Sequence, residues 1–219
     1  MLVPIRTKSL RAHVHDRLHQ AIVSGKLPAG QRLNERQLAA DLEVSTSPLK
    51  EALRQLESEG LVRAEPRKGT YVTFSARQAE EMSLARAALE SVITQQAAKH
   101  GTEAHFDTLR AAIDKMRAAA LSADGDELIA LNEQFHEAIH EASGCHYLRQ
   151  LQRTQRMYDH ATRVTVLTDP QVRKASFLEH EGIMLAIVAR DGARAGQLMH
   201  DHIIKAGGQH IARVFGTTD

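Results

Sequence analysis

The spacing of apolar residues after residue 76 constrains this chain more than any other feature. Six stretches there repeat apolar residues at helical intervals, and no alternating strand pattern interrupts them. These stretches lie near residues 77–100, 103–121, 125–142, 146–166, 171–190 and 192–213. Short breaks such as Gly101-Thr102 separate them. The pattern predicts an all-α bundle of about six helices around a central cavity.

The front of the chain follows a different pattern. Apolar stripes predict one helix over residues 9–24, a short second helix that Asn34 caps, and a third that begins at Ser45 or Ser47. The stretches "LVRA" and "TYVTF" then predict two short strands around the basic tip "EPRKG". Three helices and a basic hairpin make a winged helix-turn-helix. We therefore expect a mainly α protein, with a domain boundary near Ser75-Ala76.

The two expected domains, a winged helix-turn-helix over residues 1–75 and an all-helical domain over residues 76–219, differ in charge. The first holds 12 Lys/Arg and 8 Asp/Glu, a net charge of +4, and the second holds 16 and 19, a net charge of −3. A basic front favours a polyanion as its partner, although an imbalance this small also arises by chance. The single cysteine, Cys145, fits a reducing cytoplasm, and no apolar run is long enough to span a membrane.

The third helix of the front domain is the expected DNA-reading element. In the major groove of double-stranded DNA, it would present its first turn to base edges and phosphates. Lys50 on this helix can reach a guanine acceptor, but it lacks the bidentate fork of arginine. Taken alone, each of these basic residues is explained equally well as a DNA contact or as a solvated surface side chain. The expected contact residues are Arg36, Ser45, Thr46, Ser47, Lys50, Arg54, Arg67, Lys68 and Gly69, the last three at the tip of the wing.

Residues 25–72, "GKLPAGQRLNERQLAADLEVSTSPLKEALRQLESEGLVRAEPRKGTYV", resemble the DNA-binding domain of the GntR family of bacterial transcription regulators. The matching pieces keep the family's order and spacing: the Pro-x-Gly link, "LAADLEVS", "SPLKEAL", "LESEGLV" and the glycine of the wing. The family pattern usually has Arg, Thr and Arg where this chain has Thr46, Ser47 and Lys50. The resemblance implies an operator-binding domain. Because the three departures lie at contact positions, the family's usual operator sequence does not follow for this chain.

The stretch "NEQFHEAIH" at residues 132–140 contains His136-Glu137-x-x-His140, which is the zinc-peptidase signature. On a helix, the apolar face passes through Phe135 and Ile139, whereas Glu137 lies opposite that face and His140 lies at its solvent margin. A peptidase needs both histidines on the metal and the glutamate over the bound water. A metal-dependent hydrolase that uses these three residues is therefore only the alternative, and we expect no enzyme.

Three histidines on separate helices are expected to face the interior. Asn132 and His136 share one flank of their helix at i, i+4 spacing, His180 flanks the apolar stripe of its helix, and His202 lies within the apolar face of the last helix. His200 is expected to point to the other side. Three imidazoles and an amide oxygen suit zinc, nickel or another divalent ion. A lone inward histidine is more often a hydrogen-bonded core residue.

The rear domain resembles the all-helical FCD-type effector domain of the FadR-like GntR subgroup. The matching pieces are "RAALE", "LNEQFHEAI", "SFLEHEGIMLAIVARD" and "LMHDHI". Many members hold a metal between an acidic or amide residue and three histidines, and the resemblance places these ligands at Asn132, His136, His180 and His202. Arg86 matches a position that often faces the cavity, where it would bind an effector carboxylate. An interhelical salt bridge is an equal alternative for Arg86.

The combined expectation is a cytoplasmic, DNA-binding transcription regulator that acts as a homodimer on a pseudo-palindromic operator. A small organic acid would ligate the metal, bind one arrangement of the dimer better, and change operator affinity by linkage. We expect the protein to repress transcription and the effector to relieve that repression.

Overall fold

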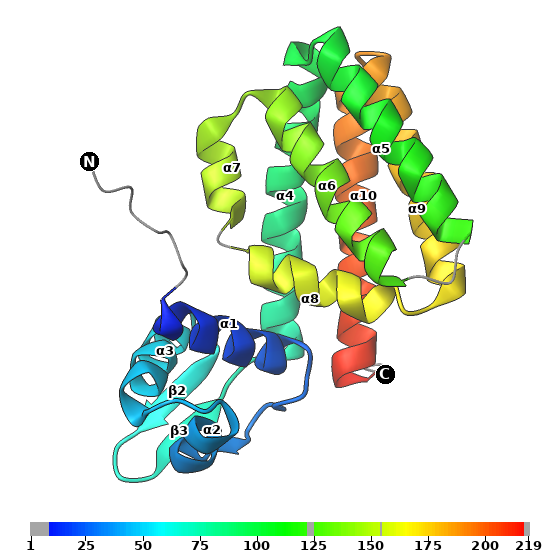
Figure 1. Ribbon diagram of the computed structural model, residues 1–219. Helices are drawn as coiled ribbons and strands as arrows, with labels where there is room; N and C mark the ends of the chain where they lie inside the picture. The colour runs from blue at the N-terminus through cyan, green and yellow to red at the C-terminus, as the bar shows by residue number, and fades with distance from the viewer. Residues whose placement is uncertain (1–8, 122–124, 154, 217–219) are drawn as a thin grey trace. The chain divides into compact units, whose positions relative to one another are not determined.

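The computed structural model describes residues 9–121, 125–153 and 155–216 (Figure 1). The chain divides into two compact units, residues 1–78 and residues 79–219. Helix α4, Ala76–His100, begins just before this division. The first unit therefore extends three residues past the end of the expected front domain at Ser75. The predicted mainly α fold is confirmed.

The front unit is a winged helix-turn-helix, as predicted. Its elements are α1 Leu10–Val23, β1 Arg32–Leu33, α2 Glu35–Asp41, α3 Thr46–Ser58, β2 Val62–Glu65 and β3 Gly69–Val72. The strands form an antiparallel sheet in the order β1-β3-β2, with Val62 opposite Val72 and Glu65 opposite Gly69 in the hairpin. Figure 1 shows this hairpin of β2 and β3. Strand β1, which the apolar pattern did not predict, pairs with β3.

Side-chain caps and a small core hold the helices of the front unit. Asn34 Oδ1 accepts hydrogen bonds from the backbone N–H groups of Arg36 and Gln37, at 3.1 and 3.2 Å, so that α2 begins where expected. The core includes buried residues of α1, α3, the hairpin and the residues that flank it: Val14, Leu18, Ile22, Leu49, Ala52, Leu56, Leu61, Val72 and Phe74. Because Leu49 and its neighbours on one face of α3 are buried, the opposite face of α3 is exposed.

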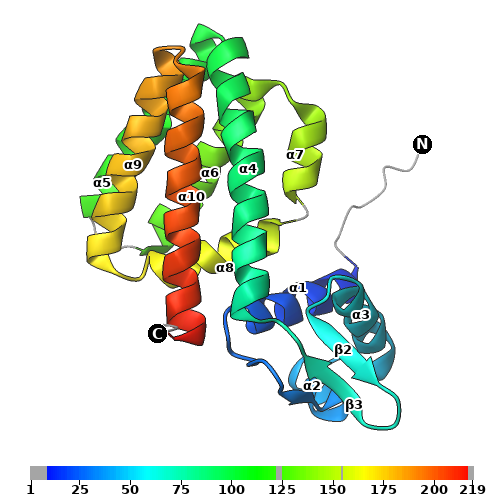
Figure 2. The ribbon, with the colours of Figure 1, turned by 180° about the vertical axis from the view of Figure 1, so that it is seen from behind.

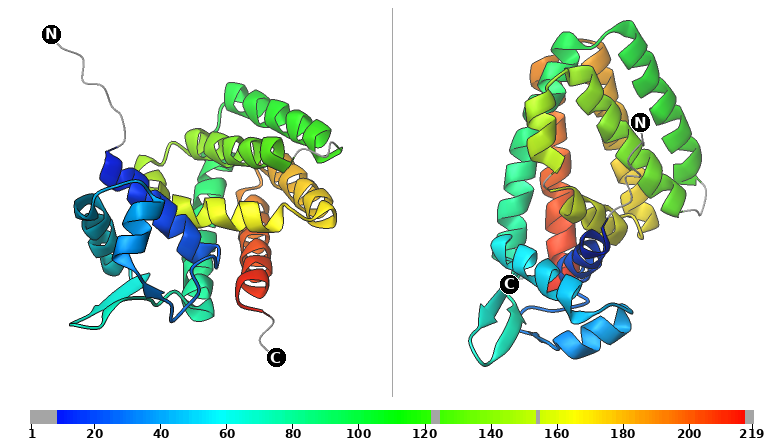
Figure 3. Two further views of the ribbon diagram at one scale, coloured as in Figure 1. Left: turned by 60° about the horizontal axis from the view of Figure 1, so that its bottom comes forward. Right: turned by 60° about the vertical axis from the view of Figure 1, so that its left-hand side comes forward.

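The rear unit is all-helical, as predicted. After α4, its helices are α5 Glu103–Leu121, α6 Gly125–Ser143, α7 His146–Arg153, α8 Arg156–Val166, α9 Pro170–Val188 and α10 Gly192–Phe215. The stretch expected as one helix over residues 146–166 forms two, α7 and α8, so the described part of this unit has seven helices rather than about six. Figures 1 and 2 show α4 beside α10 on one side of the bundle and α5 with α6 on the other. Helix α8 runs across one end of the bundle, where it packs on α10 (Figure 3).

The core of the rear unit brings α4, α5, α6, α9 and α10 close together. Its fully buried residues include Ile93, Phe106, Ile113, Phe135, Ile139, Ile183, Ile187 and Met199. A glycine permits the close approach of α10 to α4, because a Cβ atom on Gly207 would lie 2.4 Å from Ser83 Oγ. Among the described residues, no helix is long and apolar enough to cross a membrane.

Candidate DNA interface and histidine cluster

Helix α3 and its N-cap residue carry most of the expected DNA-reading residues at the surface. Ser45, Thr46, Ser47, Lys50 and Arg54 are all exposed, and so is Arg36 on α2. Ser45 is the N-cap residue of α3, yet its hydroxyl makes no capping hydrogen bond. The open first turn of α3 therefore offers backbone N–H groups and hydroxyls to an anion such as a DNA phosphate.

The tip of the wing is basic and has a constrained backbone. Arg67 and Lys68 are exposed, and Lys68 Nζ lies 3.3 Å from Glu65 Oε2. Arg67 and Gly69 have φ angles of 65° and 113°, in the left-handed region that favours glycine. A Cβ atom at Gly69 would lie 2.9 Å from Nε of the exposed Arg32 side chain, which is free to move, so the φ angle is the stronger reason for glycine here. The turn presents two positive charges at one point of the surface.

Three buried histidines from three helices meet in the rear unit. His136 on α6, His180 on α9 and His202 on α10 are 3%, 0% and 7% exposed. One ring nitrogen of each lies within 4.8 Å of the others, a spacing that a metal ion could bridge. The rings of His180 and His202 are 4.3 Å apart at their centroids. The structure thus brings together the three histidines expected from the sequence, and we call them the histidine cluster.

The outer nitrogens of the histidine cluster face acceptors. His180 Nδ1 lies 2.6 Å from the carbonyl oxygen of Ser176, and His202 Nδ1 lies 2.7 Å from Glu179 Oε2. His136 Nδ1 lies 3.8 Å from the carboxylate of Glu90. Metal-binding histidines commonly donate their second N–H to such acceptors, which directs the Nε2 lone pair inward.

Burial keeps two of these imidazoles neutral. Burial lowers the pKa of His136 to about 3 and holds the pKa of His180 well below its usual value, where the nearby His202 and His136 lower it further. A neutral imidazole is the form that binds a metal ion.

Asn132, the fourth expected ligand, lies beside the histidine cluster with its oxygen turned away. Its Nδ2 is 3.2 Å from His180 Nε2, and its Oδ1 accepts a hydrogen bond from Arg163 Nε across 2.7 Å. Burial and the nearby Arg86 lower the pKa of Arg163 to about 10, so this guanidinium is charged at neutral pH. Arg163 was missed by the sequence analysis, because the sequence around it in α8 carries no motif.

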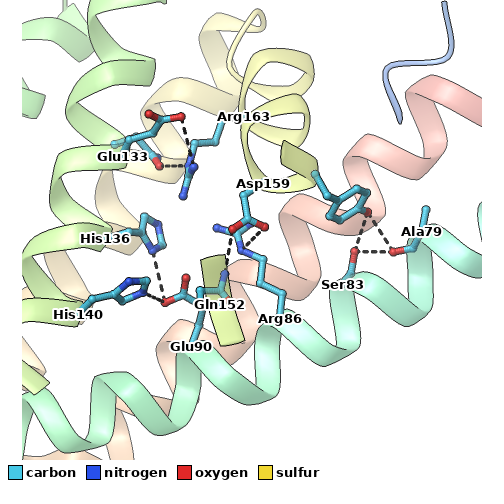
Figure 4. Close-up of polar contacts among 12 residues, drawn as sticks. Ala79, Ser83, Arg86, Glu90, Glu133, His136, His140, Gln152, Asp159 and Arg163 are labelled. Atoms are coloured by element: carbon cyan, nitrogen blue, oxygen red, sulfur yellow. Dashed lines mark hydrogen bonds and ion pairs between the residues drawn. The ribbon is translucent and has the colours of Figure 1, made fainter. Parts of the chain in front are cut away.

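Arg86 makes the interhelical salt bridge that was the alternative to effector binding. Its Nε lies 3.0 Å from Asp159 Oδ1, and the two side chains, from α4 and α8, are almost completely buried (Figure 4). Arg86 also lines a small cavity of about 20 Å³ beside His136 and His202. A ligand carboxylate could reach Arg86 only in competition with Asp159.

The second histidine of the H-E-x-x-H stretch is not at the solvent margin, so that expectation is wrong. His140 is 7% exposed, and its Nε2 lies 2.9 Å from Glu90 Oε2 (Figure 4). Burial alone would raise the pKa of Glu90, but His140 and His136 hold it well below its usual value. Glu137 is exposed and pairs with Arg149, as its expected outward position implies. His200, also expected to point away, lies 3.2 Å from Asp201.

A cavity of about 450 Å³ adjoins the histidine cluster. It is lined mainly by polar side chains: Glu90, Glu133, Gln134, His136, Glu137, His140, Arg149, Gln152, Arg153, Asp159 and Arg163. His136 and Arg163 line both this cavity and the smaller one beside the histidine cluster. A small polar molecule in the larger cavity would therefore lie next to the cluster.

Comparison with known proteins identifies both units. Residues 10–72 match the family of bacterial regulatory proteins named gntR, and residues 81–205 match the FCD domain. The HTH-type transcriptional repressor GlaR of Escherichia coli is 32% identical over 199 residues, which cover 85% of this chain and 89% of GlaR. The HTH-type transcriptional regulator YdhC of Bacillus subtilis is 28% identical over 190 residues, which cover 86% of this chain and 85% of YdhC.

A solved structure supports the same fold. The E. coli protein McbR/YncC superimposes with a TM-score of 0.68 at 22% identity, covering 91% of this chain and 95% of its own. The matched family and the similar proteins are transcription regulators rather than enzymes, which gives the hydrolase alternative no support. The chain therefore belongs to the GntR family of bacterial transcription regulators, in which it combines a winged helix-turn-helix DNA-binding domain with an FCD domain.

Proposed function

We propose that this DNA-binding regulator is a repressor whose operator affinity changes when a small carboxylate binds in the rear unit. The observation that carries the proposal is the convergence of His136, His180 and His202 beside a cavity of about 450 Å³. A cavity of this size accommodates a metabolite-sized ligand. The repressor name of the similar protein GlaR supports the sign of the regulation.

The histidine cluster is proposed to bind one divalent ion, either zinc or another such as nickel. The acceptors behind two of the rings, Ser176 O and Glu179, support this proposal because they direct the Nε2 lone pairs of His180 and His202 inward. Bound there, the ion would supply a positive charge that attracts the oxygens of an acid.

The walls of the cavity tolerate a negatively charged ligand. Two of the buried carboxylates that line it already have basic partners, since Glu90 contacts His140 and Asp159 contacts Arg86. Arg163 adds a buried guanidinium next to the histidine cluster. An entering carboxylate would therefore meet the guanidinium of Arg163, which lines both the cavity and the pocket beside the histidine cluster.

Ligand binding is proposed to reach the DNA through a homodimer. Two copies of α3 are needed to read both halves of a pseudo-palindromic operator. The protein is proposed to act on chromosomal DNA in the cytoplasm. A carboxylate that binds one arrangement of the dimer more tightly shifts the population toward it, and operator affinity follows by linkage.

Fluorescence anisotropy of a labelled operator tests this proposal. The operator is first selected from random DNA with the unmodified protein. A panel of small organic acids is then titrated against zinc-loaded protein and against protein stripped with EDTA. We expect at least one acid to weaken operator binding by the loaded protein about fivefold or more, with a smaller effect on stripped protein. An equal response of stripped protein, or no response to any acid, would contradict the proposal. His200→Ala, outside the histidine cluster, is the matched control.

A further inference from the structure

The side-chain amide of Asn132 contacts a different neighbour at each of its two ends. Its Oδ1 accepts a hydrogen bond from Arg163 Nε at 2.7 Å, and its Nδ2 lies 3.2 Å from His180 Nε2. All three side chains are buried, with Asn132 3% exposed, His180 0% and Arg163 8%. The residue expected to offer an oxygen to a metal ion therefore presents its amino group to the histidine cluster.

Arg163 determines which end of the amide faces which way. The Nε–H group of Arg163 can only donate, so it requires the oxygen of Asn132. His180 Nδ1 contacts the carbonyl oxygen of Ser176, which can only accept, so the proton lies on Nδ1 and a lone pair lies on Nε2. In the metal-free chain that lone pair accepts from the amino group of Asn132, but a bound ion would take the same lone pair, so this contact does not fix the amide in the loaded site. Reversing the amide would set N–H against N–H at Arg163, whether or not the ion is bound.

From this arrangement we infer that Arg163 withholds Asn132 from the metal, so that the histidine cluster binds a divalent ion with three protein ligands and no fourth. The inference rests on the proposed metal site and specifies its ligands. Arg163 is a positioning residue here, since it acts on the site through Asn132. The position that Asn132 leaves vacant is then available to an oxygen of a carboxylate that enters from the adjoining cavity.

Moving the Asn132 oxygen from Arg163 to the ion is unfavourable, so the arrangement with three protein ligands is favoured. A hydrogen bond from a charged donor is stronger than one between neutral groups, and burial strengthens it further. Releasing Asn132 would leave the buried Nε–H of Arg163 without its acceptor. Carbonyl-type oxygens suit hard ions such as magnesium and calcium, whereas imidazole suits zinc and nickel. The ion therefore gains little from the amide oxygen, while Arg163 loses its partner.

A double-mutant cycle measured by metal titration tests the inference. Zinc is titrated into the full chain against a chromogenic chelator, for the unmodified protein, Asn132→Ala, Arg163→Met and the double variant. Asn132→Ala should change zinc affinity by less than about threefold, because no ligand is removed. Arg163→Met should raise zinc affinity about tenfold or more, because it frees the amide oxygen to turn inward. That gain should fall below about threefold when Asn132 is already alanine.

Two results would overturn the inference. A loss of zinc affinity of about tenfold or more in Asn132→Ala would make Asn132 a ligand in the unmodified chain. An equal gain from Arg163→Met in both backgrounds would show that Arg163 acts through its charge and not through Asn132. Circular dichroism checks the fold of each variant, and Asn132→Ser replaces Asn132→Ala if alanine unfolds the chain. If the unmodified chain does not bind zinc at all, that result would contradict the proposed metal site itself, and this inference with it.

Discussion

His140 Nε2 lies 2.9 Å from Glu90 Oε2, and this contact joins α6 to α4 in the interior of the rear unit (Figure 4). One turn earlier in α6, His136 also lies 3.8 Å from Glu90 through its Nδ1, and its ring faces His180 and His202. The two histidines of the H-E-x-x-H stretch therefore share Glu90, but only His136 belongs to the histidine cluster, and Glu137 between them pairs with Arg149 at the surface. The peptidase signature in this chain is a coincidence of helical sequence, which agrees with its membership of a family of regulators.

Replacing Lys50 should weaken operator binding and change base preference. Lys50 is exposed in the first turns of α3, where a base contact discriminates by about 1 to 3 kcal/mol. Lys50→Ala should therefore bind the selected operator about tenfold or more weakly and tolerate changes at one base pair. Electrophoretic mobility shifts with operator variants measure both effects. Lys99→Ala, which removes the same charge from the exposed surface of α4, should leave both unchanged.

Replacing Arg67 should weaken DNA binding without changing base preference. Arg67 lies at the tip of the wing with φ 65°, so Arg67→Asn removes the charge with a residue that tolerates this backbone conformation. Loss of one phosphate contact should make the slope of log affinity against log salt shallower by about 1. Anisotropy titrations over a range of salt concentrations measure this slope. An unchanged slope would remove the wing tip from the DNA interface.

Gly207 should be intolerant of a methyl group, whereas its neighbour Gly208 should accept one. A Cβ atom on Gly207 would lie 2.4 Å from Ser83 Oγ on α4, so Gly207→Ala should destabilise the rear unit by about 1 to 3 kcal/mol. Apart from its own helix, none of the described residues has an atom within 4 Å of a Cβ built on Gly208, so Gly208→Ala should be neutral or stabilise by about 0.5 to 1 kcal/mol through helix propensity. Chemical denaturation compares the two. Equal losses of stability would contradict the close packing of α10 on α4.

The contact between His15 and Glu59 should stabilise the front unit in a limited pH range. His15 Nε2 lies 2.9 Å from Glu59, whose hydrogen bond raises the pKa of His15 above its ordinary value of 6.5, and Asp16 acts in the same direction. The adjacent His19 stays neutral, because burial lowers its pKa to about 4. A raised histidine pKa contributes stability that is fully present below 6.5 and is lost as the pH rises through the pKa of the folded state.

Glu59→Gln tests this pH dependence, since it replaces the charged carboxylate with a neutral amide of similar shape. The difference in thermal stability between the unmodified chain and Glu59→Gln should be largest near pH 6 and should shrink as the pH approaches 9. His13→Gln, which is exposed on the same helix, is the matched control. A difference that stays constant over this pH range would show that the contact does not depend on protonated His15.

Much of the architecture follows from local sequence patterns. The helical spacing predicted α4, α5, α6, α9 and α10 to within a few residues, because each has an apolar stripe and a clear break at its ends. The same spacing indicated that His136, His180 and His202 face inward, which is a property of each helix taken alone. The break between α7 and α8 carries no Gly or Pro, so the pattern gave no signal for it.

The polar partners of the site could not be predicted in the same way. Arg163 on α8 and Asn132 on α6 are 31 residues apart, and their contact depends on how α8 crosses the end of the bundle. The burial of His140 has the same origin, since it requires Glu90 on α4 as a partner. Helical spacing places a side chain on a face of its own helix, but the partner that compensates its charge comes from tertiary packing.

Metal analysis of purified protein tests the central claim most directly. The unmodified chain, His180→Ala, Glu137→Ala and His200→Ala are purified without chelator or metal-affinity resin and analysed by inductively coupled plasma mass spectrometry. The account predicts about one divalent ion per chain in the unmodified protein. It predicts the same content in Glu137→Ala and His200→Ala, and almost none in His180→Ala, because only His180 belongs to the histidine cluster. Full metal occupancy in His180→Ala would contradict it.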